Sequence, residues 1–271
     1  SFGPQTLFEG VSFLINEGER VGLVGKNGTG KSTLFKMILG QESPDSGILT
    51  TPKGYRIGTL EQIICFTQPT LLEECIKVLS PDKQWDHYKA EIILSGIGFS
   101  ELDFLKDPTT FSGGYQVRIN LCKALLANPN MLLLDEPTNY LDILSLRWLK
   151  EYLNKWPGEM MLITHDRDFM DKVTTHTLGL YRKQAKKVKG DTVKFYEQII
   201  QEEEAYELTR KNLESKRKEM QLLIDRFRAK ASKASMAQSR LKMMGKMGTM
   251  KKLDTEKNLG FRFNHLSCPG K

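Results

Sequence analysis

The residues best suited to chemistry form a glycine-rich loop, GKNGTGKS, that runs from Gly25 to Ser32. The loop follows an apolar run typical of a strand and precedes a segment with a helical pattern. Its glycines allow backbone N–H groups to turn toward phosphate oxygens, and the helix N-terminus adds free donors and a favourable dipole. The expected phosphate ligands are Gly25, Asn27, Gly28, Gly30, Lys31, Ser32 and Thr33.

Three side chains of this loop and helix start have distinct expected tasks at a nucleotide. The ammonium of Lys31 would reach the β- and γ-phosphates, and the hydroxyl of Ser32 would ligate Mg²⁺. Thr33 would touch the α-phosphate. A chance glycine-rich turn is the alternative, and the position between a strand and a helix argues against it.

Two adjacent acids, Asp135 and Glu136, follow four apolar residues in the run MLLLDEP. Asp135 suits a role at Mg²⁺, either as a ligand or through a bound water. Glu136 suits a base that orients an attacking water molecule. Ordinary surface charge is the alternative, but surface acids rarely follow a continuous apolar run at a strand end.

A second candidate anion site precedes the segment YQVRINLCKAL. Ser112, Gly113 and Gly114 stand at the start of this amphipathic helix. A serine hydroxyl and glycine amides at a helix N-terminus suit an anion. Because the first loop already binds phosphates, the sequence leaves open whose phosphate this site would hold.

Strands and helices alternate around these motifs. Continuous apolar runs at 20–25, 131–137 and 159–165 predict buried parallel strands, whose carboxyl ends carry ligand chemistry. Helices are expected at 31–39, 114–127 and 143–154. The pattern predicts an α/β fold.

Composition limits the function classes. The 271 residues carry a net charge of +7, but residues 209–252 hold 14 Lys and Arg against three acids, so the remainder is acidic overall. A local basic tract indicates a local anionic partner. No apolar run approaches a membrane span, and no signal-peptide pattern is visible. Cys65, Cys75, Cys122 and Cys268 lack metal-ligand spacing, so reduced thiols in a cytoplasmic protein are expected.

A long helix is expected after residue 194. Apolar residues recur every seven positions at Ile199, Tyr206, Leu213, Met220 and Phe227, and the positions three residues after each are mostly polar until Leu223. One helix over 195–227 would span roughly 50 Å. A second apolar row, which predicts a shorter return helix after a bend at AKASKAS, comprises Met236, Met243, Met247 and Met250.

The basic tract over 226–248 has two interpretations, a solvated helical face or a nucleic-acid contact. It contains one aromatic residue, Phe227, which belongs to the apolar stripe. Phosphate contact is therefore expected rather than base stacking. The candidate RNA-binding residues are Arg226, Arg228, Lys230, Lys233, Arg240 and Lys242.

The motifs together resemble those of ATP-binding-cassette ATPases, in that superfamily's order. Besides the motifs above, the resemblance rests on Gln62 in TLEQ, on NYLD at 139–142 and on His165, and it covers residues 2–193. It implies a P-loop NTPase fold of the ABC type with a helical signature subdomain at about 65–128. It also implies head-to-tail pairing of two cassettes, in which the Ser112–Gly114 segment of one closes over the γ-phosphate held by the other.

The same resemblance assigns further roles. Gln62 would sense Mg²⁺ and the lytic water, which makes it a catalytic and metal-site candidate. His165 would hydrogen-bond the γ-phosphate, and Asp142 would lie at the contact between cassettes. Phe2 would stack on adenine. ATP and Mg²⁺ are the implied ligands, and the implied activity is an ATPase that needs a second cassette.

Two departures from transporter cassettes resemble the ABC-F subfamily, whose soluble tandem cassettes act on ribosomes. Tyr115 follows the SGG segment, and NYLD replaces a TSALD-type sequence. The segment 224–242 also resembles the ABC-F interdomain linker, whose tip approaches ribosomal RNA and peptidyl-site tRNA. The implied organisation is a cassette over 1–193, a helical interdomain linker over 194–260, and the start of a connection to a second cassette over 261–271.

The second cassette would be supplied in cis by a longer protein or by homodimerisation of this chain. Two other interpretations remain open at this point. One is the nucleotide-binding subunit of an ABC transporter, which would pair with a separate membrane protein. The other is a DNA-repair or chromosome ATPase, but those proteins place their coiled coil between the P-loop and the DE strand.

Overall fold

The computed structural model describes residues 6–60, 65–79, 86–228, 234–246, 248 and 250. Contacts divide the chain into two compact units, Ser1–Tyr196 and Glu197–Lys271. The sequence-based division into a cassette over 1–193, a linker over 194–260 and a connection over 261–271 stays a prediction.

A six-stranded sheet forms the centre of the first unit, in the order β2–β3–β4–β1–β5–β6. Neighbouring strands are parallel except β5 and β6, which pair antiparallel. The strands are β1 (Arg20–Gly25), β2 (Ile57–Thr59), β3 (Met131–Asp135), β4 (Glu159–Ile163), β5 (His176–Tyr181) and β6 (Gln184–Lys189). The predicted strands correspond to β1, β3 and β4.

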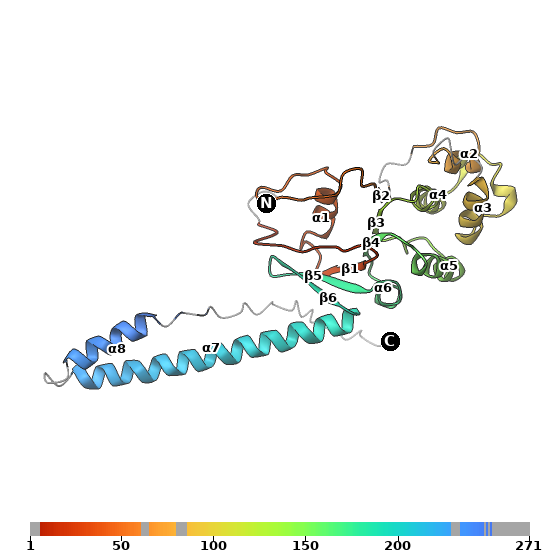
Figure 1. The fold of residues 1–271 in the computed structure, drawn as a ribbon. Coiled ribbons are helices and arrows are strands. Elements are labelled where there is room, and N and C mark those ends of the chain that lie inside the picture. The colour runs from red at the N-terminus through yellow and green to blue at the C-terminus, as the bar shows by residue number, and fades with distance from the viewer. Residues whose placement is uncertain are drawn as a thin grey trace, which may run out of the picture. The chain divides into compact units, whose positions relative to one another are not determined.

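Each face of the sheet packs against its own hydrophobic cluster. Leu132 and Leu134 of β3 belong to one cluster, whereas Met131 and Leu133 belong to the other. Because side chains alternate along a strand, a strand buried on both faces is apolar at every position. Figure 1 shows α1 (Lys31–Ile38) on one side of the sheet, and α4 (Gly113–Leu126) and α5 (Ile143–Asn154) on the other.

Between β2 and β3 the described residues form a helical subdomain. It comprises α2 (Leu71–Ile76), α3 (His87–Gly96), the 3₁₀ turns η2 (Glu101–Asp103) and η3 (Pro108–Thr110), and α4. Along the chain, β3 is followed by α5 and β4, and α6 (Arg167–Val173) then leads into β5. The α/β fold with a helical signature subdomain that the sequence predicts is therefore confirmed.

A buried carboxylate organises this subdomain. The side chain of Glu74 on α2 is fully buried. It accepts hydrogen bonds from the backbone N–H groups of Thr67 and Gln68, at 3.0 and 3.1 Å, and it pairs with Lys123 of α4 and with Lys77. One carboxylate thus holds the chain before α2 and the helix α4 together.

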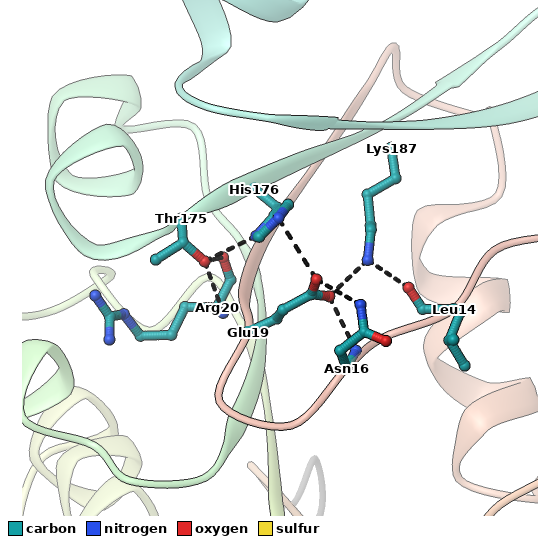
Figure 2. Close-up of polar contacts among 7 residues, drawn as sticks. All are labelled: Leu14, Asn16, Glu19, Arg20, Thr175, His176 and Lys187. Carbon is teal, nitrogen blue, oxygen red and sulfur yellow. Dashed lines mark hydrogen bonds and ion pairs between the residues drawn. The ribbon is translucent and has the colours of Figure 1, made fainter.

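A second polar cluster ties the start of β1 to the far edge of the sheet. Figure 2 shows the carboxylate of Glu19 accepting from Lys187 of β6 and from Asn16, with His176 of β5 3.5 Å away. Burial alone would raise the pKa of Glu19, but the hydrogen bonds from Lys187 and Asn16 outweigh it and lower that pKa to about 2. The charge of Glu19 is balanced by Lys187 within the cluster, so we assign the cluster a structural role.

Two helices follow β6. The first, α7 (Thr192–Arg228), contains the predicted helix over 195–227, and α8 (Ala234–Lys246) covers part of the predicted return helix. The described residues include no helix that is both long and apolar enough to cross a membrane. The predicted bend at AKASKAS lies mostly outside the described residues.

The apolar seam of α7 differs from the sequence prediction in one respect. Its first row is half-buried as expected at Ile199, Tyr206, Leu213 and Met220. The second row lies four residues after the first rather than three, so Ile224 is buried whereas Leu223 is exposed. Both spacings face the first row on a 3.6-residue helix, so the sequence pattern alone could not distinguish them.

Candidate functional site

Glycine conformations shape the loop between β1 and α1. Gly28 and Gly30 have positive φ angles of 80° and 98°, which residues with a Cβ adopt at a cost. Gly30 is also the N-cap of α1, and a Cβ there would lie 2.7 Å from the ring of Phe8. The loop therefore ends at the N-terminus of α1, whose first N–H groups suit an anion.

The ammonium of Lys31 lies across this loop. It donates hydrogen bonds to the carbonyl oxygens of Gly25 and Lys26, at 2.7 and 3.1 Å. Burial lowers the pKa of Lys31, while the negative charges of Asp135 and Glu136 oppose that shift. A phosphate would offer this ammonium stronger, charge-assisted hydrogen bonds than the carbonyls do.

Asp135 is the last residue of β3, and the Ser32 hydroxyl is close enough to its carboxylate to influence its pKa. Burial, followed by the neighbouring charge of Glu136, raises the pKa of Asp135, and Lys31 and Ser32 act in the opposite direction. A partly buried carboxylate next to a hydroxyl is a suitable setting for a hard divalent cation.

The donor set fits Mg²⁺ bound together with phosphate. The described residues contain no group of three or more His, Cys, Asp or Glu that could hold a metal unaided. Mg²⁺ commonly takes one or two protein oxygens and completes its shell with phosphate oxygens and water. Ser32 and Asp135 can supply those protein oxygens.

Glu136 and His165 meet where β3 and β4 end. The backbone N–H of Glu136 donates to the carbonyl of Ile163 at 2.8 Å, and Glu136 has a positive φ of 50°. Its carboxylate accepts from the backbone N–H of His165 at 3.3 Å, and the imidazole Nε2 lies 3.4 Å from its other oxygen. A non-glycine residue in this conformation costs about 1 kcal/mol or more, which is typical of functional positions.

The second predicted anion site lies at the N-terminus of α4. Ser112 is the N-cap, and its hydroxyl makes no capping hydrogen bond to the described residues. A Cβ at Gly113 would meet no described atom within 4 Å, whereas one at Gly114 would lie 3.2 Å from Tyr140. Gln116 secures the preceding loop by donating to the carbonyl of Phe111 at 2.9 Å.

Arg118 connects this helix to the segment that leads into α5. Its guanidinium donates to the carbonyl oxygens of Tyr140 and Ile97, at 2.8 and 2.9 Å, and lies 3.3 Å from Asp142. Asp142 in turn caps α5 by accepting from the N–H of Ser145, and this hydrogen bond lowers the pKa of Asp142. The α4 anion site and Asp142 therefore form one connected structure.

The structure gathers the predicted site residues into two groups. The first contains the loop residues Gly25, Asn27, Gly28, Gly30, Lys31, Ser32 and Thr33, with Asp135, Glu136 and His165. The second contains Ser112, Gly113 and Gly114. Figure 1 shows α1 and α4 on opposite sides of the sheet, so the second group does not join the first within this chain.

Four of the predicted residues cannot be located, because Phe2, Gln62, Lys230 and Lys233 lie outside the described residues. In the second unit, Arg226 of α7 and both Arg240 and Lys242 of α8 are exposed. Arg228 lies in α7, and its side chain is not described. The roles of all these residues stay predictions.

Sequence reasoning missed two residues of the site. Phe8 packs against Gly30, which the sequence did not indicate because 22 positions separate the two residues. Arg118 holds Tyr140 and Asp142. The only available signal was its position four residues after Gly114, on the same face of the predicted helix.

Family models and curated relatives match most of this chain. Two family models match, both described as ABC transporter, over residues 8–139 and 178–263. The putative ATP-binding protein YdiF of Bacillus subtilis is 32% identical, over 97% of this chain and 48% of its own length. ATP-binding cassette sub-family F member 3 of Rattus norvegicus is 31% identical, over 97% of this chain and 42% of its own length.

Solved structures show the same fold. A structure described as the ATP-binding subunit of an ABC transporter has a TM-score of 0.62 at 24% identity, over 73% of this chain and 89% of its own. A dimeric ATP-binding cassette bound to ADP and phosphate has a TM-score of 0.54 at 23% identity, over 68% of this chain and 90% of its own.

The chain belongs to the ATP-binding-cassette family, since the family models, the relatives and the fold agree. Within that family it is an ABC-F protein, matching a first cassette and the segment that follows. It spans less than half the length of these curated relatives.

Proposed function

We propose that this chain forms the first cassette and the linker of an ATP-hydrolysing ABC-F protein that acts on ribosomes. One observation carries the enzymatic part. Lys31, Asp135 and Glu136 gather at the carboxyl ends of parallel strands. The charge of Asp135 raises the pKa of Lys31, and the charge of Lys31 lowers the pKa of Asp135, each against the effect of burial. Ligands of open α/β sheets bind at this edge.

Each residue would have one task. Lys31 would neutralise β- and γ-phosphate charge, and Ser32 with Asp135 would hold Mg²⁺, which stabilises the charge that develops on the phosphates. The carboxylate of Glu136 would accept a proton from the attacking water and orient it. His165, whose side chain is largely exposed, would fix Glu136 and donate to the γ-phosphate.

A second cassette would complete the site. The Ser112 hydroxyl, which makes no capping hydrogen bond to a described residue, and the open face of Gly113 suit a phosphate that comes from outside this chain. Head-to-tail pairing would deliver that phosphate. Tyr140, Ile143 and Leu144, next to Asp142, are exposed apolar residues that such pairing would cover.

The linker would bind RNA. Exposed Arg226, Arg240 and Lys242 support phosphate contacts with ribosomal RNA and peptidyl-site tRNA, and Arg228, Lys230 and Lys233 would add to them. Closure of two cassettes on ATP would set the linker's orientation, and hydrolysis would release it, in the manner of other nucleotide switches.

Cosedimentation tests the ribosomal assignment. The full-length protein carrying Glu136→Gln would be mixed with ATP and with either purified ribosomes or inverted membrane vesicles. We expect retention on ribosomes that depends on ATP and falls when Lys31→Ala removes nucleotide binding. The alternative is the nucleotide-binding subunit of a transporter, which the description of both family models favours. Retention on vesicles alone would establish that alternative.

A further inference from the structure

A groove of about 860 Å³ lies in the cassette, between α3, the η2 turn and α5. It contains none of the residues assigned to nucleotide or to RNA. The lining residues that bear on binding are Tyr88, Glu91, Ile92, Gly96, Glu101 and Trp148.

The wall of the groove is a fixed aromatic surface. The indole of Trp148 lies so close to Gly96 that a Cβ there would be 2.0 Å from the ring. Trp148 also stacks on Tyr152, with 5.0 Å between ring centroids and 26° between planes. Because the indole is held on both sides, the groove is preformed rather than created by binding.

The groove exposes large apolar side chains. Tyr88 and Ile92 on its rim are 52% and 55% exposed. Leu102 and Leu105, which are close in sequence to the lining residues Glu101 and Phe104, are 79% and 76% exposed. Exposed apolar side chains in a groove that also carries polar residues are typical of a protein–protein contact.

Its charge is negative. Glu91 and Glu101 line the groove, and neither makes an ion pair with a described residue. The described lining contains no basic residue. Lys89 and Lys106, which are close in sequence to lining residues, pair with Asp86 and Asp103, each at 2.7 Å. Arg147 precedes Trp148 on α5 and is a further cation near the groove in sequence.

We propose that this groove binds a basic amphipathic segment of a partner protein. The partner's large apolar side chain would pack on Trp148 and Ile92. Arginine or lysine residues flanking it would pair with Glu91 and Glu101, because complementary charge at a rim selects the partner and speeds encounter. A nucleic acid is disfavoured here, since its phosphates would face two carboxylates.

Binding of a defined probe to the 271-residue chain tests the proposal. The probe is a fluorescein-labelled 15-residue peptide with leucine and phenylalanine on one helical face and arginine on the other. The comparators are the same peptide with glutamate for arginine, and a labelled 12-nucleotide uridine RNA. We expect the basic peptide to bind at least about tenfold more tightly than the acidic peptide, in fluorescence anisotropy at low salt.

Matched variants locate the binding. Ile92→Ala should weaken the basic peptide about tenfold, whereas Ile48→Ala, at an isoleucine that is 93% exposed elsewhere, should not change it. Glu91→Gln with Glu101→Gln should weaken it severalfold and flatten its salt dependence. The control pair Glu9→Gln with Glu17→Gln removes the same charge from another exposed region and should have no effect.

Isoleucine-methyl NMR gives a second measurement that does not depend on the variants' affinities. Adding the basic peptide should shift the Ile92 methyl signal and leave the Ile48 signal in place. An unshifted Ile92 signal, or equal weakening by the two double variants, would overturn the proposal. So would RNA that competes for the Ile92 site, or a dimer of this chain that Ile92→Ala dissociates, because either result would identify a different occupant.

Discussion

Two groups of His165 contact the carboxylate of Glu136. The backbone N–H donates to one oxygen at 3.3 Å, and the imidazole Nε2 lies 3.4 Å from the other oxygen. The strand β3 carries the first residue and β4 leads into the second, and the two strands are paired in parallel from Met131 with Glu159 to Asp135 with Ile163. Register alone therefore brings together two residues that are 29 positions apart.

Replacing Glu136 by glutamine should leave ATP binding intact and slow hydrolysis about 100-fold or more. The amide keeps the shape of the side chain but cannot accept the proton of the attacking water, a contribution of roughly 10²–10⁴ in rate. Phosphate release measured at saturating ATP, with binding of a fluorescent ATP analogue as the control, checks this in the paired form. Unchanged turnover would remove Glu136 from the mechanism.

The isolated chain should hydrolyse ATP weakly, because Ser112 and Lys31 lie in separate groups. A mixing experiment sharpens this expectation. Lys31→Ala and Ser112→Glu should each be inactive alone, and their mixture should regain activity, since one composite site then has both an intact loop and an intact Ser112. A carboxylate near a helix N-terminus interacts favourably with the helix dipole, so Ser112→Glu should fold.

The measurement is specific activity against protein concentration, with the oligomeric state followed in the same samples. Activity of a proven monomer at the level of the mixture would show that one chain suffices.

Glu74→Gln should destabilise the cassette by about 3 kcal/mol at pH 7. Burial would raise the pKa of Glu74, but hydrogen bonds from Lys77, Thr67, Lys123 and Gln68 outweigh it and lower the pKa to about 2, from 4.5. An acid whose pKa is lowered by folding stabilises above its unfolded value and loses that contribution as pH falls toward the folded value. The difference between variant and parent should therefore shrink from pH 5 to pH 2.

Urea unfolding at several pH values measures this effect. Glu73→Gln, at an adjacent residue that bonds only locally to Thr70, is the matched control and should change stability little. A pH-independent difference for Glu74→Gln would mean that the loss is one of packing rather than charge.

Gly30→Ala should cost more stability than Gly28→Ala, although both glycines have positive φ. Each substitution brings about 1–3 kcal/mol of backbone strain. The Cβ at Gly30 would also meet the Phe8 ring at 2.7 Å, whereas the one at Gly28 meets no described atom within 4 Å. Thermal unfolding of both variants, and of Gly30→Ala combined with Phe8→Ala, measures the contact. The double variant should recover part of the extra loss.

Neutralising Arg226, Arg228, Lys230 and Lys233 should weaken binding to ribosomes and reduce its dependence on salt. If all four contact phosphates, the slope of log affinity against log salt should fall by roughly 3. The control replaces Lys211, Lys216, Arg217 and Lys218, four cations elsewhere on α7. An unchanged slope in the first variant would mean that the tract is solvated.

The sequence predicted β1, β3 and β4 because each is buried on both faces and has a continuous apolar run with a charged residue at one end. It did not predict β2, β5 or β6. β2 has three residues, and β6, QAKKVK, contains three lysines, because a sheet-edge strand can carry charge that a central strand cannot. The hydrophobic pattern of β2 is therefore too short, and that of β6 too polar, to stand out.

By itself the sequence determined the chemistry of each motif, since phosphate binding at 25–33 and the acids at 135–136 depend on local residue order and on the strand-to-helix context. Tertiary structure decided which motifs meet. Parallel pairing of β3 and β4 brought His165 into contact with Glu136. Folding of the helical subdomain separated Ser112 from Lys31 and allowed Arg118 to donate to the carbonyl of Tyr140. It also selected Ile224 over Leu223 in α7, because two neighbouring positions satisfy the same helical period and only packing distinguishes them.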